Sequence, residues 1–201
     1  MAYPLGRRLH QLIESRQFPG CSIHGSFFRA RLVRTSDVLD SEALAAPIRG
    51  VSPGHRFSHA GQRVFYAAET KDVAVAEVIG EMKAALVWTQ EFKITPLEPL
   101  LDLTLDIESA LDQRHLLIAA LLDMNALARP SEDGSTWKPA YLMTQFIADC
   151  ARKAAYVGIK YSSTRGPGEN IVIFDPDALA AHLCSEGEPS ILVHKPRADK
   201  F

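Results

Sequence analysis

The sequence predicts a single α+β domain, built on a mixed or largely antiparallel sheet with surrounding helices. Its 201 residues, 47% of them hydrophobic, are enough to bury the core of one domain of ordinary size. Segments of strand and helix character are intermixed, without the regular alternation that indicates a doubly wound parallel sheet. No internal repeat or low-complexity segment divides the chain, so we expect residues 1–201 to form one domain.

The N-terminal part is expected to contain a helix and a strand. Apolar residues at helical spacing predict a helix over 5–16, which Pro19-Gly20 ends. Strand formers predict a strand over 27–33, on which Arg29 and Arg31 share one face. Our preferred interpretation of these two cations is an exposed edge strand that charge keeps soluble, and a binding role is the alternative.

A strand followed closely by a helix is expected next. The apolar stretch 64–68 predicts a buried strand, and Thr70 or Asp72 can cap a helix that runs to about Leu86. At 100° per residue, Glu77 lies roughly opposite the apolar stripe of this helix. Glu77 is therefore not a core residue.

The remaining elements follow from the same signals of periodicity, proline and glycine. We expect loops over 35–53 (with at most one helical turn) and 129–137, helices over 107–128, 139–156 (with Gly158 as C-terminal cap) and 177–184, strands over 87–94, 100–103, 158–161, 171–174 and 191–193, and a polar tail over 195–201.

Charge and cysteine content exclude several classes of protein. The formal charge of −2 and scattered Lys and Arg residues give no basic patch for nucleic acid. Three widely spaced cysteines, Cys21, Cys150 and Cys184, resemble neither a disulfide framework nor a Cys-x-x-Cys metal site. The N-terminus lacks the apolar core of a secretory signal, and no run of about 18 apolar residues indicates a membrane span. We expect a soluble, cytoplasmic protein.

The commonest catalytic motifs are absent. The sequence contains no Gly-x-Gly-x-x-Gly, no phosphate-binding Gly-x-x-x-x-Gly-Lys-Ser/Thr and no His-Glu-x-x-His. His55 and His59 lack a third ligand at a familiar spacing, so no metal site is expected. The polar residues that remain are ordinary when each is taken alone, and they are Arg56, Tyr66, Glu77, Ser163 and Asn170.

Taken together, the spacing of these residues resembles the RES domain, which is named for its Arg, Glu and Ser. Ten positions separate Arg56 from Tyr66, and eleven separate Tyr66 from Glu77. The resemblance continues at Phe28-Arg29-Ala30-Arg31, which is similar to the first strand of that family. Tyr161-Ser162-Ser163, with Asn170-Ile171-Val172-Ile173-Phe174-Asp175-Pro176, is similar to its C-terminal signature. The core of the resemblance covers about 27–176, preceded by an N-terminal helix and lead-in (1–26) and followed by a C-terminal helix and tail (177–201).

The resemblance implies a bacterial toxin with a fold similar to ADP-ribosyltransferases, acting on NAD and neutralised by an antitoxin protein. NAD would be its substrate, and no cofactor is implied. The main hypothesis is an NAD glycohydrolase that yields nicotinamide and ADP-ribose. The alternatives are a mono-ADP-ribosyltransferase that modifies a protein, and a non-catalytic binding module on the same fold. The sequence gives no indication of the oligomeric state or of the surface that an antitoxin would contact.

The residue types suit this chemistry. Cleavage of the nicotinamide–ribose bond builds positive charge on the ribose, which a carboxylate such as Glu77 can stabilise. Arg56 would hold the pyrophosphate or the adjoining ribose, with Arg29 or Arg31 as a second clamp. Nicotinamide leaves as a neutral base, so the reaction requires no dedicated general acid.

Aromatic and neutral polar residues complete the expected site. Tyr66 could stack on the nicotinamide ring. Ser163 would hydrogen-bond the ribose or the carboxamide, and Asn170 would shape its loop. The sequence departs from the family at Ser162, where members often have Pro, so Ser162 and Ser163 both remain candidates, with Ser163 favoured by its distance from Tyr161. It also departs around Arg56, where members often have Gly-Arg-Trp/Phe-Asn.

Overall fold

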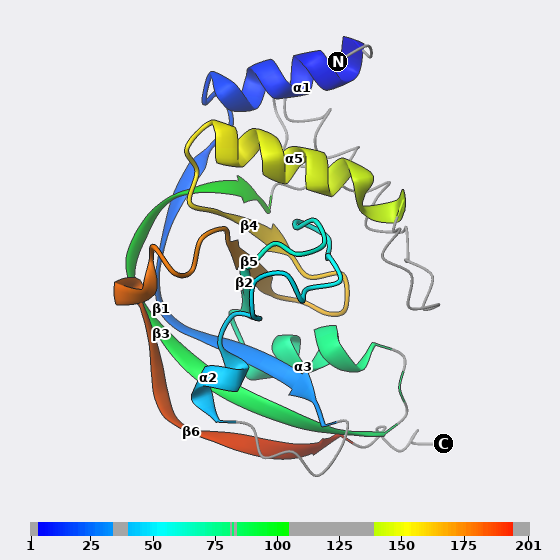
Figure 1. Cartoon of the computed structure of the whole chain (residues 1–201), viewed down its shortest axis with the longest axis vertical. Coiled ribbons are helices and arrows are strands. Elements are labelled where there is room, and N and C mark those ends of the chain that lie inside the picture. Colours follow the sequence, from blue (N-terminus) through cyan, green and yellow to red (C-terminus); the bar gives the residue numbers. More distant parts are fainter. Residues whose placement is uncertain (1–3, 34–39, 81, 83, 105–138, 195–201) are drawn as a thin grey trace.

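The computed structural model describes residues 4–33, 40–80, 82, 84–104 and 139–194 (Figure 1). The helix expected over 107–128, the loop over 129–137 and the tail from 195 lie outside the described residues. The α-helices are α1 (Pro4–Glu14), α2 (Ser41–Leu44), α3 (Lys71–Ile79) and α5 (Leu142–Lys153), and the 3-10 helices are η1 (Pro139–Tyr141) and η2 (Ala180–His182). The strands are β1 (Gly20–Leu32), β2 (Phe65–Ala68), β3 (Ala85–Leu103), β4 (Gly158–Ser162), β5 (Glu169–Ile173) and β6 (Leu183–His194).

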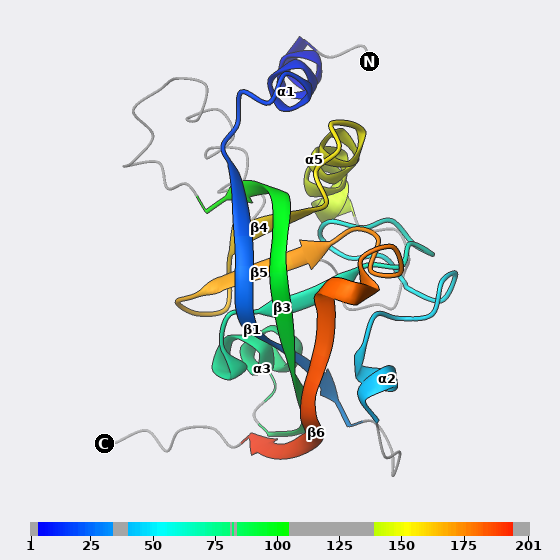
Figure 2. The ribbon, with the colours of Figure 1, turned by 90° about the vertical axis from the view of Figure 1, so that its left-hand side faces the viewer.

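The strands form one mixed sheet in the order β1-β2-β5-β4-β3-β6, in which β1 also pairs with β3. The pairing of β3 with β4 is parallel and the others are antiparallel. Strands β1, β3 and β6 run along the long axis, and β2, β4 and β5 lie across them (Figure 2). This mixed sheet with helices around it confirms the predicted α+β class.

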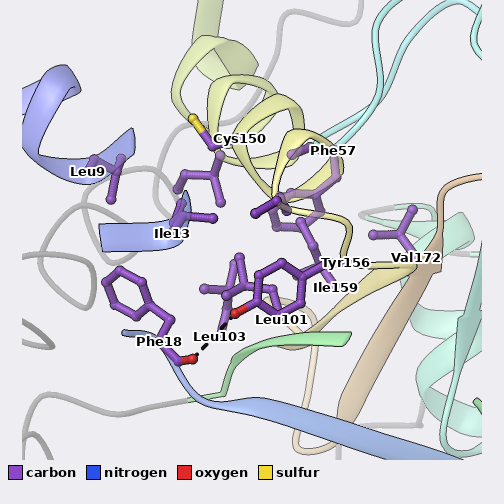
Figure 3. Packing of buried hydrophobic residues seen from close by; sticks show 14 of the residues in the cluster. Leu9, Ile13, Phe18, Phe57, Leu101, Leu103, Cys150, Tyr156, Ile159 and Val172 are labelled. Carbon is purple, nitrogen blue, oxygen red and sulfur yellow. Dashed lines mark hydrogen bonds between the residues drawn. The ribbon is translucent and has the colours of Figure 1, made fainter. Parts of the chain in front are cut away.

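One hydrophobic cluster joins α1 and α5 to the crossing strands (Figure 3). Ile13 of α1, Ile147 of α5 and Ile159 of β4 are all fully buried in it. Phe57, from the loop that carries Arg56, is buried in the same cluster. Complete burial of one such side chain stabilises a fold by roughly 1.5–3 kcal/mol, so the loop is attached to the core through Phe57.

The helix α3 packs on the long strands through a separate cluster. Val73 and Ile79 of α3 lie against Ala30 of β1. The hydroxyl of Thr70 caps α3 by accepting a hydrogen bond from the N–H of Val73 at 3.3 Å, as the sequence predicted.

Two helices are shorter than predicted. Helix α3 ends at Ile79 instead of about Leu86, because Gly80 adopts a positive φ of 54° and the chain then enters β3 at Ala85. Helix α5 ends at Lys153, and Gly158 is not its cap but the first residue of β4. A Cβ at Gly158 would lie 2.3 Å from the carbonyl oxygen of Val172, so the approach of β5 requires the glycine.

Three strands are longer than predicted. β3 is one strand of 19 residues instead of the two expected over 87–94 and 100–103. β1 begins at Gly20 rather than 27, and β6 covers twelve residues rather than 191–193. The helix expected over 177–184 is the single turn η2, since the chain enters β6 at Leu183. Among the described residues, no helix is long and apolar enough to cross a membrane.

Candidate functional site

The carboxylate of Glu77 is the centre of a hydrogen-bonded group. Ser163 Oγ and Asn170 Nδ2 each donate to Glu77 Oε1, and both distances are 2.7 Å. Glu77 projects from the exposed side of α3, whereas Asn170 is only 3% exposed. Ser163 and Asn170 lie 86 and 93 positions after Glu77 in the chain, and both are in direct contact with it. All three residues were predicted from the sequence.

Ser163, rather than Ser162, makes this contact. The N–H of Arg165 donates to Ser163 Oγ at 3.1 Å, so the hydroxyl accepts from the loop while it donates to Glu77. The N–H of Ser163 donates to the carbonyl of Gly168 at 2.9 Å, which closes the loop between β4 and β5. A Cβ at Gly168 would lie 2.7 Å from Val73 Cγ2, so this loop packs directly on α3.

Tyr66 of β2 anchors the loop that carries Arg56. Its hydroxyl accepts from the N–H of Phe57 at 3.0 Å and donates to Ser58 Oγ at 3.3 Å. Burial raises the pKa of Tyr66 to about 12, although these two hydrogen bonds lower it, so the phenol is protonated at neutral pH. The described hydroxyl contacts of Tyr66 thus connect β2 to the Arg56 loop, and the stacking role expected for its ring stays a prediction.

One face of α5 holds the same loop from the other side. Gln145 Nε2 donates to the carbonyls of His55 and Ser58 at 3.1 and 3.0 Å. Further along, Arg152 Nη2 donates to the carbonyl of Phe57 at 3.3 Å, and Asp149 pairs with His59 at 2.8 Å. The spacing of residues 145, 149 and 152 places them on one helix face. The backbone on both sides of Arg56 is therefore fixed by α5.

Tyr141 lies next to Arg56 and near Glu77, and the sequence did not single it out. The Arg56 guanidinium carbon is 5.8 Å from the centroid of the Tyr141 ring. Burial raises the pKa of Tyr141. The positive charges of Arg56 and Arg165 lower this pKa, and the negative charge of Glu77 raises it. Both guanidinium groups and the carboxylate are therefore close to this phenol. Tyr141 belongs to no motif and stands where η1 leads into α5, so no local pattern could have identified it.

Tyr161 is a second residue that the sequence did not assign to the site. Its ring centroid is 4.7 Å from that of Phe57, at the base of the Arg56 loop. Burial raises the pKa of Tyr161 well above its ordinary value, and nearby Tyr66 and Glu77 add to the rise while Arg56 lowers it. This phenol is therefore neutral and lies among the predicted site residues.

Arg29 and Arg31 lie on β1, in a different environment from Glu77. The Arg29 guanidinium is 5.3 Å from the ring centroid of Phe65, and its buried Nη1 has no hydrogen-bond partner in the described part of the chain. Burial lowers the pKa of Arg29 to about 9, with contributions from Arg31 and Arg63. Burial also lowers the pKa of Arg31. The interpretation of an exposed edge strand is wrong, because β1 pairs with both β2 and β3 and both Arg29 and Arg31 are only partly exposed.

The described residues contain no group of three or more His, Cys, Asp or Glu side chains that could hold a metal ion.

Comparison with known proteins identifies a family and a fold. Residues 29–190 match the family model of the RES domain. No curated protein shows significant sequence similarity to the chain. Among solved structures, this chain resembles a chain in the crystal structure of the M. tuberculosis MbcT-MbcA toxin-antitoxin complex. The TM-score is 0.58 and the sequence identity is 16%, and the alignment covers 96% of this chain and 94% of the chain in that complex. At this level of identity, the likeness shows a shared fold.

Proposed function

The chain belongs to the RES domain family, and from this premise we propose that it is the toxin of a toxin–antitoxin pair that cleaves NAD. The reaction would break the nicotinamide–ribose N-glycosidic bond and release nicotinamide and ADP-ribose. The observation that carries this proposal is the Glu77 carboxylate, one oxygen of which is held by Ser163 and Asn170. NAD is a substrate in this scheme.

The geometry suits stabilisation of positive charge on a ribose. Both hydrogen bonds to Glu77 reach Oε1, and no described residue donates to Oε2. One oxygen is thus fixed, and the other would face the ribose carbon as its bond to nicotinamide breaks. The bonding electron pair leaves with nicotinamide, which becomes neutral. Water then adds to the ribose carbon and loses a proton to solvent.

Arg56 is suited to bind the phosphates of NAD. Tyr66, Gln145 and buried Phe57 hold its loop, so little loop entropy is lost when the guanidinium engages a ligand. A guanidinium presents a rigid fork of donors that matches phosphate oxygens. Arg56 would thereby fix the distance between the diphosphate and Glu77, which places the scissile bond beside the carboxylate.

Release of nicotinamide from NAD by the purified protein tests this function. Wild-type protein should yield nicotinamide and ADP-ribose in equal amounts. Glu77→Gln keeps the shape but removes the negative charge, and should lower kcat by about 100- to 1000-fold. Arg56→Ala should mainly raise KM. The matched control is Glu69→Gln, since Glu69 is exposed just before α3 and its side chain forms none of the hydrogen bonds to Glu77.

Three outcomes would contradict the proposal. Wild-type protein that is free of any partner and releases no nicotinamide would overturn it. Radiolabelled NAD that becomes attached to macromolecules of a cell extract would instead indicate transfer of ADP-ribose to an acceptor. Growth inhibition in cells that persists after Glu77→Gln would indicate a binding module without catalysis.

We also propose that an antitoxin protein neutralises this chain in the cytoplasm. The structural neighbour comes from a complex described as toxin–antitoxin, which supports a partner of this kind. The antitoxin would contact both the Arg56 loop and the Ser163 loop and so cover Glu77. Addition of the purified antitoxin should therefore stop nicotinamide release, and NAD in excess should slow its association. Inhibition that is independent of NAD concentration would place the contact elsewhere.

A further inference from the structure

A second arginine, Arg165, lies beside the group formed by Glu77, Ser163 and Asn170. Arg165 belongs to the loop between β4 and β5, two residues after Ser163. Its backbone N–H donates to Ser163 Oγ, the same oxygen that donates to Glu77. The backbone of Arg165 is therefore one hydrogen bond away from the central group.

The side chain of Arg165 turns towards α3. Its Nη2 and Cζ lie 3.7 and 3.9 Å from the position that a Cβ would take at Gly80. Gly80 ends α3 three residues after Glu77, so it lies about one helical turn from the carboxylate. The guanidinium thus lies beside the C-terminal end of α3, where the helix dipole favours a cation.

Arg56 and Arg165 both lie near the phenol of Tyr141, one from the loop before β2 and the other from the loop after β4. The Arg56 guanidinium is 5.8 Å from the ring centroid, and the charges of both arginines act on the phenol. Among the described residues, neither arginine forms a salt bridge with an acidic side chain. Within the described part of the chain, two arginines without an acidic partner therefore lie near the group around Glu77, Arg56 over Tyr141 and Arg165 beside the end of α3.

We propose that Arg56, over the ring of Tyr141, and Arg165, beside the end of α3, form a two-arginine cradle for the diphosphate of the substrate. This inference rests on the proposed cleavage of NAD and names the residue that complements Arg56. A diphosphate carries one negative charge on each phosphate, and one guanidinium can pair with each. The cradle also offsets the repulsion that Glu77 alone would exert on an anionic substrate.

The cradle adds Arg165 to the expected phosphate clamp, and the role expected for Arg29 or Arg31 stays a prediction. The Arg29 guanidinium is 5.3 Å from the ring centroid of Phe65, and the charges of Arg31 and Arg63 act on it. Arg165 is exposed and is bonded through its backbone to Ser163. It can therefore reach a ligand at Glu77 without any change in the core.

Substrates that differ only in their phosphates test the cradle. Arg165→Gln should lower kcat/KM for NAD by about 10- to 100-fold, the loss expected for one charge-assisted pair. The same variant should change kcat/KM for nicotinamide riboside, which has the same scissile bond but no phosphate, by less than about twofold. Nicotinamide mononucleotide, with one phosphate, should lie between them. The matched control is Arg7→Gln, an exposed arginine on α1, which should alter none of the three.

Binding measurements keep the inference separate from the proposed reaction. Calorimetric titration should show that ADP-ribose binds wild-type protein and binds Arg165→Gln about tenfold or more weakly. If wild-type protein binds ADP-ribose through both arginines but releases no nicotinamide, the cradle stands and the reaction fails. Equal losses for NAD and nicotinamide riboside would show that Arg165 acts only through the Ser163 loop. That result, or unchanged ADP-ribose affinity in the variant, would overturn the cradle.

Discussion

The substitution Asn170→Asp tests the contact that organises the site, because it changes one amide nitrogen into an oxygen without changing the shape of the side chain. Asn170 is 3% exposed and its Nδ2 lies 2.7 Å from Glu77 Oε1. The backbone of Asn170 pairs with Ala68 of β2 and Tyr161 of β4, so the strand holds the side chain in place. The introduced carboxyl therefore cannot move away from Glu77.

The distance sets the size of the effect. At 2.7 Å, two unit charges repel by about 6 kcal/mol with an effective dielectric constant of about 20, and by about 1.5 kcal/mol in bulk water. Water reaches Glu77 but not residue 170, so the repulsion lies between these limits. The introduced carboxyl responds by keeping a proton, which raises its pKa above the ordinary value for aspartate.

The sign of the pH dependence follows from this shift. The pKa of the introduced carboxyl is higher in the folded than in the unfolded chain, so the variant keeps its stability below about pH 4 and loses it as the pH rises towards neutrality. The loss should reach at least about 1.5 kcal/mol, or about 3 °C in Tm for a chain of this size. Nicotinamide release should also fall, because the shared proton reduces the negative charge available to the ribose.

Thermal unfolding of wild type and Asn170→Asp between pH 4 and 8 measures this loss. Asn170→Ala is the matched control, since it removes the amide without adding a titrating group. Its Tm should lie below that of wild type, without the larger fall towards neutrality that the added charge produces. A Tm difference between Asn170→Asp and wild type that does not change with pH would refute the contact with Glu77.

Two further predictions concern buried groups. Arg29→Met should raise the free energy of unfolding by about 1–3 kcal/mol in urea titrations, because it removes a buried donor that has no described partner; a lower value would show that Arg29 is satisfied in solution. Burial raises the pKa of Cys21 and of Cys150 to about 11, whereas Cys184 is exposed. Iodoacetamide at pH 8 should therefore modify Cys184 first, as followed by mass spectrometry, and faster labelling of Cys150 would contradict this order.

Local signals in the sequence predicted the elements that depend on local physics. The Thr70 cap, the strands around 64–68 and 171–174, and the exposed position of Glu77 all follow from periodicity and capping. The length of β3 could not be predicted from local signals, because prolines such as Pro96 and Pro99 are typical of strand ends. In the structure these prolines lie near positions where the register of β1 against β3 shifts, and the strand continues through the irregularity.

The site was predictable only as far as the family resemblance extended. It indicated Glu77, Ser163 and Asn170, which are in contact, and it favoured Ser163 without excluding Ser162. The contribution of α5 had no signature in the sequence, because the bonds from Gln145 to the Arg56 loop join residues 87 and 90 positions apart. A glutamine on an amphipathic helix has the same local pattern whether it faces solvent or the carbonyls of a distant loop.

The register of β5 couples the hydrophobic core to the chemistry of the site. Ile171 and Ile173 are fully buried on one face of this strand, and Asn170 faces the other way towards Glu77. A shift of one residue would turn Asn170 into the core and present an isoleucine to the carboxylate. The shift would remove the amide that donates to Glu77, and it would move Ile171 and Ile173 out of the cluster that they fill. Both effects oppose the shift. The register of β5 therefore places the amide against Glu77, and changes that loosen this strand should reduce activity before they unfold the protein.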